Sequence, residues 1–149
     1  MKVKEVNVKI KKINEKATIP TYGSDFAAGA DLYACIDDTI TIKKNETVFV
    51  STGLSMEIPE GMAGLIYARS GLACKKGLAP ANKVGVVDSD YRGEIIVALH
   101  NHSKEDYELQ NGERIAQMVF TPYYKGIFKE EKLSETKRGS GGFGSTGKK

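Results

Sequence analysis

The sequence predicts an all-β domain that carries one short helix. Two patterns lead to this prediction: short runs rich in apolar and β-branched residues recur along the chain, and Gly, Pro, Asn or Asp residues separate them. With 149 residues, of which 40% are hydrophobic, the chain is long enough to build one domain around its own core. Short strands at this close spacing are typical of a sandwich or a barrel.

The first strand is expected near the N-terminus, where Val6, Val8 and Ile10 alternate with polar residues, so that an extended chain would bury one face. The one helix is expected at 70–76, where Gly77 follows as a stop signal. At about two turns, this helix is too short to form a packing layer of its own. Six further runs are expected to form strands: 39–42, 47–51, 54–58, 64–68, 94–100 and 115–120.

The composition changes at Lys137, after which Gly, Ser, Thr and Lys dominate and Phe143 is the only apolar residue. Such a segment cannot bury enough apolar surface to fold by itself. We therefore expect a β domain, a sandwich or a barrel, at 1–136, followed by a flexible glycine-rich arm or a disordered end at 137–149.

Charge, apolar runs and cysteines exclude several classes of protein. The net charge of +3 comes from 22 basic and 19 acidic residues that are evenly scattered, which does not favour nucleic-acid binding. No apolar run reaches the roughly 18 residues of a membrane span, and residues 1–16 lack the apolar block of a signal peptide. We therefore expect a cytoplasmic protein that binds neither membranes nor nucleic acid. Cys35 and Cys74 lack the spacing of a zinc site or a disulfide framework, so both are expected to be reduced thiols.

Two motifs suggest other chemistry. Residues 142–148 match a phosphate-binding loop, but Lys149 stands where Ser or Thr belongs, and neither a strand before the motif nor a helix behind it is expected. His100 and His102 would share one face of a strand and could bind a metal or serve a nuclease. No Cys, Asp or Glu at a suitable spacing completes that ligand set, so we favour two surface histidines at the end of a strand.

Five other segments concentrate small and polar residues where a plain β-sandwich would want neither. They are AGADLYA at 28–34, ARSGLA at 68–73, GVVDSDYRGE at 85–94, GERIAQMVF at 112–120 and RGSGGFGSTG at 138–147. In order and content they resemble the trimeric dUTPase family, over nearly the whole chain. The resemblance implies a jelly-roll subunit, a distorted β-barrel, in a homotrimer whose active sites are shared between subunits. Ala68 departs from the family, in which Pro is common at this position, but the change removes no functional group.

The same resemblance implies a dUTP diphosphatase that converts dUTP to dUMP and pyrophosphate, limits uracil incorporation into DNA and supplies dUMP for thymidylate synthesis. Asp88 would be the catalytic base for the water that attacks the α-phosphorus, a role that suits a carboxylate beside a metal-bound triphosphate. Tyr91 would lie against the deoxyribose and leave no room for a 2′-hydroxyl. Asn82, Gly85 and Val87 would bind uracil, with the amide of Asn82 reading its edge and a close backbone at Gly85 excluding the methyl group of thymine.

Residues that would bind the phosphates come from two more segments. Arg69, Ser70 and Gly71 offer a cation, a hydroxyl and a main-chain amide at the start of the predicted helix. Gln117 lies in an otherwise apolar strand and needs a polar partner, and the resemblance implies that this partner is the triphosphate.

Residues of the arm complete the implied substrate site. Arg138 would contact the γ-phosphate, Phe143 would stack on uracil, and Ser145 and Thr146 would cover the phosphates beside Gly144, which also belongs to the implied site. Because ordering the arm costs conformational entropy that contacts with substrate would offset, we expect it to close as a lid.

Magnesium, the expected cofactor, is expected on the triphosphate, because this ion keeps much of its water and uses few carboxylates. Asp31 is expected as a supporting residue, either in the outer shell of the Mg²⁺ ion or as an acceptor for nearby amides at a strand start. Two alternatives to a diphosphatase are weaker. A dCTP deaminase would carry a catalytic Glu where Ala98 stands, and a regulator without catalysis would not need Asp88.

Overall fold

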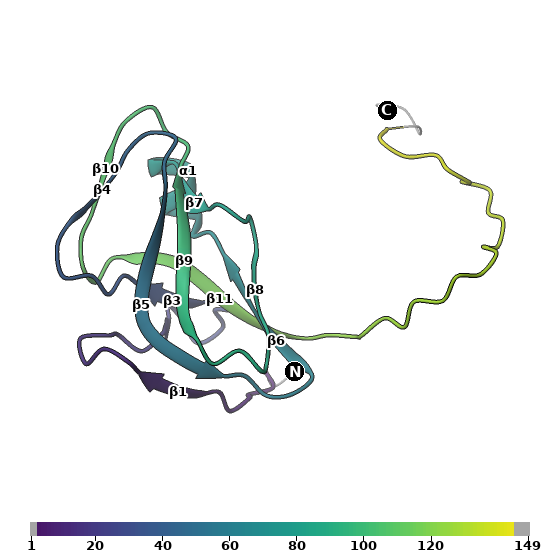
Figure 1. The fold of residues 1–149 in the computed structure, drawn as a ribbon, viewed down its shortest axis with the longest axis horizontal. Helices are drawn as coiled ribbons and strands as arrows, with labels where there is room; N and C mark the ends of the chain where they lie inside the picture. Colours follow the sequence, from purple (N-terminus) through teal and green to yellow (C-terminus); the bar gives the residue numbers. More distant parts are fainter. Residues whose placement is uncertain (1–2, 145–149) are drawn as a thin grey trace.

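The computed structural model describes residues 3–144, which contain eleven strands and one helix. The strands form three antiparallel sheets with the orders β1-β5-β9-β7, β10-β4 and β2-β3-β11-β6-β8 (Figure 1). The predicted all-β architecture with one short helix is confirmed. The elements are β1 (Lys9–Lys12), β2 (Thr21–Tyr22), β3 (Ala30–Tyr33), β4 (Ile40–Ile42), β5 (Thr47–Glu57), β6 (Met62–Tyr67), α1 (Ser70–Lys76), β7 (Leu78–Pro80), β8 (Gly85–Val87), β9 (Glu94–Asn101), β10 (Tyr107–Leu109) and β11 (Arg114–Pro122).

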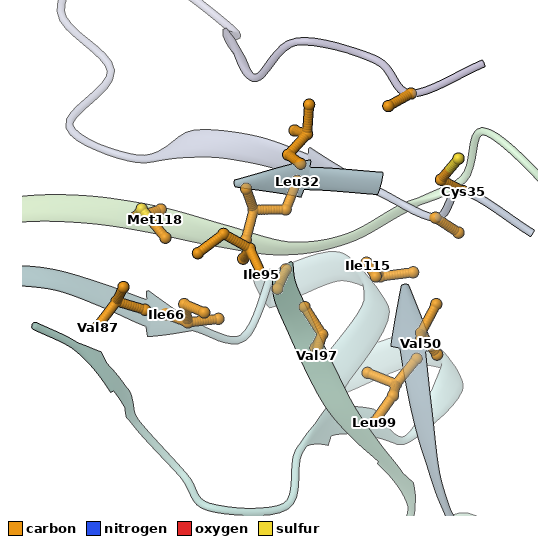
Figure 2. Close-up of a cluster of buried hydrophobic side chains, with 14 of the residues drawn as sticks. Leu32, Cys35, Val50, Ile66, Val87, Ile95, Val97, Leu99, Ile115 and Met118 are labelled. Carbon is orange, nitrogen blue, oxygen red and sulfur yellow. The ribbon is translucent and has the colours of Figure 1, made fainter. Parts of the chain in front are cut away.

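The core lies between the four-stranded and the five-stranded sheet. In β9, Ile95, Val97 and Leu99 are buried whereas the intervening Ile96 is exposed, as the alternation of a strand requires. Side chains of the other sheet, including Leu32 of β3 and Met118 of β11, belong to the same buried cluster (Figure 2). The two sheets therefore share one apolar interior.

Strand β5 differs from its prediction, because the expected strands at 47–51 and 54–58 form one element. Its ladder with β9 is interrupted: Ser51 pairs with Ile96 and Ser55 with Glu94, so four steps along β5 match two steps along β9. The two extra residues form a bulge around Gly53, whose φ of 69° lies in the left-handed region. A glycine that reads as a strand break in the sequence is thus part of a continuous strand.

The remaining differences concern short elements. The N-terminal strand begins only at Lys9, and Val6 is 43% exposed, so the predicted alternation buries less than expected. Strands β2, β3, β7, β8 and β10 were not predicted, since two to four residues are too few to show a period of two. Helix α1 has the predicted bounds, and Gly77 ends it with a φ of 70°. Cys35 and Cys74 are unpaired, as predicted.

After β11 the chain leaves the two-sheet body and continues as an extended segment (Figure 1). Its first part exposes several large apolar side chains: Tyr123, Tyr124, Ile127, Phe128 and Leu133. Residues 137–144, the described part of the predicted arm, form the far end of this segment. Within residues 3–144, no helix is both long and apolar enough to cross a membrane.

Candidate active site

A pocket of about 210 Å³ lies beside β8 and the turn that leads into β9. It brings together Asn82, Gly85, Val87, Asp88 and Tyr91, which the sequence predicted around the base, the sugar and the attacking water, but not Phe143, which was also predicted at the base. The lining consists of Ile66, Asn82, Gly85, Val86, Val87, Asp88, Tyr91, Glu94, Ile95 and Ile96. The other five lining residues were not singled out from the sequence as site residues: Ile66, Val86, Glu94, Ile95 and Ile96.

The turn between β8 and β9 holds the Tyr91 ring in place. The main chain closes the turn, since the amide of Tyr91 donates to the carbonyl of Asp88 at 3.2 Å. The Tyr91 hydroxyl donates to the carbonyl of Glu94 at 2.8 Å. A Cβ at Gly93 would lie 2.4 to 2.9 Å from atoms of this ring, so only glycine lets the ring lie this close to the backbone. Tyr91 remains 44% exposed, which leaves ring surface available to a ligand.

Asn82 lies close to the start of β8. A Cβ on Gly85 would be 3.3 Å from Nδ2 of Asn82 and 3.2 Å from Cβ of Ile66, which is tighter than an ordinary contact. Glycine therefore allows this strand to pass close to an amide that lines the pocket. The arrangement offers a hydrogen-bonding side chain next to a strand with little free space above it.

A second group of predicted residues gathers around Asp31, which is 8% exposed. Its Oδ1 accepts from Nε of Arg69 at 2.8 Å, and its Oδ2 lies 3.4 Å from Nη1 of Arg114. The carboxylate partners are thus two guanidinium groups, and not the nearby amides considered from the sequence. An ion pair of this kind fixes the Arg69 side chain.

Gln117 faces the same side of the sheet, because it pairs with Asp31 across the β3–β11 ladder. Its Nε2 donates to the carbonyl of Ala68 at 2.9 Å, which supplies the polar partner that this side chain needs. Ser70 and Gly71 begin α1 and are exposed. Together with Asp31 and Arg69, these residues form a second cluster, which we call the Asp31 cluster.

Arg114 is a member of this cluster that sequence reasoning missed. Strict alternation from Gln117 would place Arg114 on the opposite face of β11. A register shift between Arg114 and Ala116 adds one residue to β11, and Arg114 then pairs with Tyr33, two positions along β3 from Asp31. The sequence contains no signal for that irregularity.

The arm does not reach the pocket of its own chain. Figure 1 shows its described part well away from β8. Nε of Arg138 donates to the carbonyl of Gly141 at 2.8 Å, and the ring of Phe143 is fully exposed. Gly144 is exposed as well, and Ser145 and Thr146 lie outside the described residues.

The two histidines have ordinary surroundings. Nδ1 of His100 lies 2.9 Å from the hydroxyl of Thr47, and His102 is exposed beyond the strand. Asn101 between them is fully buried and donates to the carbonyls of Ile42 and Glu105. Within residues 3–144, no three His, Cys, Asp or Glu side chains are grouped as a metal site would require.

Comparisons with known proteins identify the family to which the chain is similar. The family model described as dUTPase matches residues 15–147. A deoxyuridine 5′-triphosphate nucleotidohydrolase of Desulfitobacterium hafniense (strain DSM 10664 / DCB-2) is 52% identical over 131 residues, which cover 87% of this chain and 87% of the relative. A protein of the same name from Hydrogenobaculum sp. (strain Y04AAS1) is 48% identical over 141 residues, with coverage of 94% and 97%. The solved structure of the Staphylococcus bacteriophage 80alpha dUTPase with dUPNHPP matches with a TM-score of 0.84 at 27% identity, and covers 95% of this chain and 98% of that one.

Proposed function

The chain belongs to the dUTPase family and has the activity of a dUTP diphosphatase, and we propose that it hydrolyses dUTP to dUMP and pyrophosphate through a water molecule activated by Asp88. The fold is the jelly roll of that family. The observation that supports the mechanism is that Asp88, Tyr91 and Asn82 line the same pocket.

Uracil is recognised at the start of β8. The side-chain amide of Asn82 both donates and accepts hydrogen bonds, which matches the alternating donors and acceptors along the edge of uracil. Main-chain groups from Gly85 to Val87 provide the remaining hydrogen bonds. The tight contacts around Gly85 support exclusion of a 5-methyl group by shape. Cytosine would place a donor against a donor and leave buried groups unpaired.

Tyr91 discriminates between sugars. Its ring is tethered at the hydroxyl and rests against Gly93, so it acts as a fixed wall. A deoxyribose fits against this ring, whereas the ring leaves no room for the additional 2′-hydroxyl of a ribose. The preference for dUTP over UTP is therefore steric.

Asp88 removes a proton from the water that attacks the α-phosphorus. Its side chain is exposed at the pocket edge, and within residues 3–144 no basic nitrogen lies within 4.0 Å of its carboxylate. The carboxylate is thus available to accept a proton. The bond between the α-phosphorus and the bridging oxygen then breaks, and pyrophosphate leaves.

Phosphate binding falls to Arg69, Ser70, Gly71 and Gln117, with Asp31 as the residue that holds Arg69. The dUTPase family requires a divalent metal in general, and we assign Mg²⁺. The donor set fits an ion carried mainly by the substrate, because the described residues contain no cluster of three candidate ligands and Asp31 is already paired with arginines. When bound, Mg²⁺ would neutralise charge on the triphosphate. Asp31 is the carboxylate that contacts Arg69, one of the residues proposed to bind the phosphates.

The active site is shared between copies of the chain in a homotrimer. The pocket lining includes neither Arg69 nor Gln117, and the described arm points away from the pocket. One chain thus presents three parts of the site in three places. We propose that the pocket beside the β8–β9 turn, the Asp31 cluster and the arm of different subunits meet, and that the arm at 137–149 closes over substrate as a lid on the domain at 1–136. The enzyme would work in the cytoplasm, where it limits uracil incorporation into DNA and supplies dUMP for thymidylate synthesis.

A panel of nucleotides tests this assignment. The protein is mixed with Mg²⁺ and dUTP, dCTP, UTP or dTTP, and pyrophosphate and ammonia are measured. Pyrophosphate from dUTP alone is expected. Ammonia from dCTP would indicate a deaminase, and binding without any product would indicate a regulator, so either result would contradict the proposal.

A further inference from the structure

We propose that Glu94 is a positioning residue that sets the dUTP-over-UTP preference by fixing Tyr91. It does so at both of its ends: the side chain fastens the bulge of β5, and the main-chain carbonyl holds the Tyr91 hydroxyl. The inference rests on the proposed role of Tyr91 as the wall against ribose.

The bulge provides a rigid anchor. A Cβ on Gly53 would lie 2.9 Å from both Cβ of Ala17 and Sγ of Cys35, so the bulge is packed against two other segments. The carbonyl of Gly53 accepts from the amides of Ile13 and Asn14 at 2.9 and 3.3 Å. Gly53 is therefore held in place both by close packing and by the hydrogen bonds of its carbonyl group.

The interrupted ladder between β5 and β9 leaves the amide of Gly53 without a strand partner. Oε1 of Glu94 accepts from this amide at 2.8 Å. Because Gly53 is buried, its amide would be costly to leave unpaired, and the carboxylate satisfies it. The side chain of Glu94 is thus tied to the anchor.

The same residue begins β9, directly after the turn that carries Asp88 and Tyr91. Two neighbouring contacts reinforce this junction: the hydroxyl of Thr52 donates to the carbonyl of Ile95 at 2.6 Å, and that of Ser55 to the carbonyl of Arg92 at 2.7 Å. Glu94 differs from these residues because it also lines the pocket and accepts from Tyr91. A shift of the Glu94 backbone would therefore also shift the carbonyl group that holds the Tyr91 hydroxyl.

Freedom of the ring affects the two nucleotides unequally. A wall that can move by a fraction of an ångström makes room for the 2′-hydroxyl of UTP, while dUTP gains nothing from that room. Specificity is a difference between two transition-state affinities, so the ratio of kcat/KM for dUTP and UTP reports the position of the wall.

The test compares Glu94→Ala and Glu94→Gln with Glu57→Ala as the matched control, because Glu57 lies at the same end of β5 but its exposed side chain pairs with Lys9 of β1 and not with Gly53. For each folded enzyme, the dUTP/UTP ratio of kcat/KM is measured, and thermal unfolding is followed in parallel. Glu94→Ala is expected to lower the ratio by about tenfold or more. Glu94→Gln should restore most of it, because an amide oxygen also accepts from Gly53, and Glu57→Ala should keep the wild-type ratio.

An unchanged ratio in Glu94→Ala would overturn the inference, as would a Gln variant that loses the preference to the same extent as the Ala variant. If Glu94→Ala does not fold, Tyr91→Phe removes the tether from the other side and must lower the ratio as well. Failure of the proposed function is distinguishable, because the wild-type enzyme would then lack dUTP hydrolysis altogether.

Discussion

Gly29 leaves room for the side chain of Gln117, a proposed phosphate-binding residue of the neighbouring strand β11. A Cβ at this residue would lie 2.2 Å from Oε1 and 2.9 Å from Cδ of Gln117. The two nearest atoms belong to the flexible end of the side chain, which a methyl group would push aside, while Cβ of Gln117, at 3.2 Å, would have to shift by only a few tenths of an ångström. Its hydrogen bond to the carbonyl of Ala68 would then be lost.

Gly29→Ala is therefore expected to weaken substrate binding more than folding. KM for dUTP should rise about tenfold or more, since a hydrogen bond to a charged group contributes about 1.5–3 kcal/mol. Steady-state kinetics and thermal unfolding measure the two effects. Gly23→Ala is the matched control, because a Cβ there meets nothing within 4 Å. An unaltered KM in Gly29→Ala would contradict the placement of Gln117 at the phosphates.

At the same scale, the sequence predicted which residue types gather but not their partners. Asp88 and Tyr91 could be named because they lie within a segment, 85–94, that resembles the family, and Asn82 because it lies just upstream of that segment. The pairing of Asp31 with Arg69 and Arg114 could not be predicted, since it joins β3 to two distant parts of the chain. Such contacts depend on sheet order, which local patterns do not contain.

The turn between β10 and β11 shows how one element is stabilised. The Tyr107 hydroxyl donates to Oε2 of Glu113, whose Oε1 accepts from the amide of Gln110 at 2.8 Å. Burial and, to a smaller extent, the contact with Glu113 raise the pKa of Tyr107 from 10.0 to about 12. The fold therefore favours the protonated phenol.

Tyr107→Phe is expected to lower the free energy of unfolding by about 1 kcal/mol at neutral pH, through the lost hydrogen bond. Because the folded pKa is raised, the contribution of Tyr107 is fully present below pH 10 and is lost as the pH rises toward 12. The difference between wild type and variant should therefore narrow over this window. Urea unfolding at a series of pH values measures it, and a constant difference up to pH 12 would refute the role of this contact.

Among the elements, those with complete local signals were predicted well. Helix α1 has a glycine stop, and β9 has eight residues of alternating burial. Strand β8, which lines the pocket, has three residues and was missed. Strand β5 was divided in two because a bulge and a turn use the same residue, Gly53. Length and irregularity, rather than composition, limited the prediction.

In the whole molecule the predicted site residues lie in separate places, which is the main reason to expect shared sites in the proposed trimer. Five of the residues predicted around the base, the sugar and the water line one pocket in one chain, the Asp31 cluster lies outside the pocket lining, and the described arm extends away. Exposed apolar side chains such as Phe49 and Phe128 suggest that surfaces of the single chain are covered on assembly. Local sequence patterns contain no information on such assembly, which entered only through the family resemblance.

Mixed trimers test whether sites are shared. Asp88→Asn and Arg69→Ala chains, each inactive alone, are co-expressed in equal amounts, and dUTP hydrolysis is measured. If the pocket with Asp88 and the cluster with Arg69 that form one site come from different chains, about one quarter of the sites in a symmetric oligomer combine an intact pocket with an intact cluster. Restored activity near that fraction is expected. Mixed trimers that stay as inactive as the separate variants would show that each chain builds its own site.

The most direct test of the mechanism is the Asp88→Asn variant, assayed for pyrophosphate release and for dUTP affinity by calorimetry. Loss of the base should reduce hydrolysis roughly 10²–10⁴-fold, while the dissociation constant for dUTP stays within about tenfold of wild type because the pocket keeps its shape. Hydrolysis at the wild-type rate would contradict the assignment of Asp88 as the group that activates water.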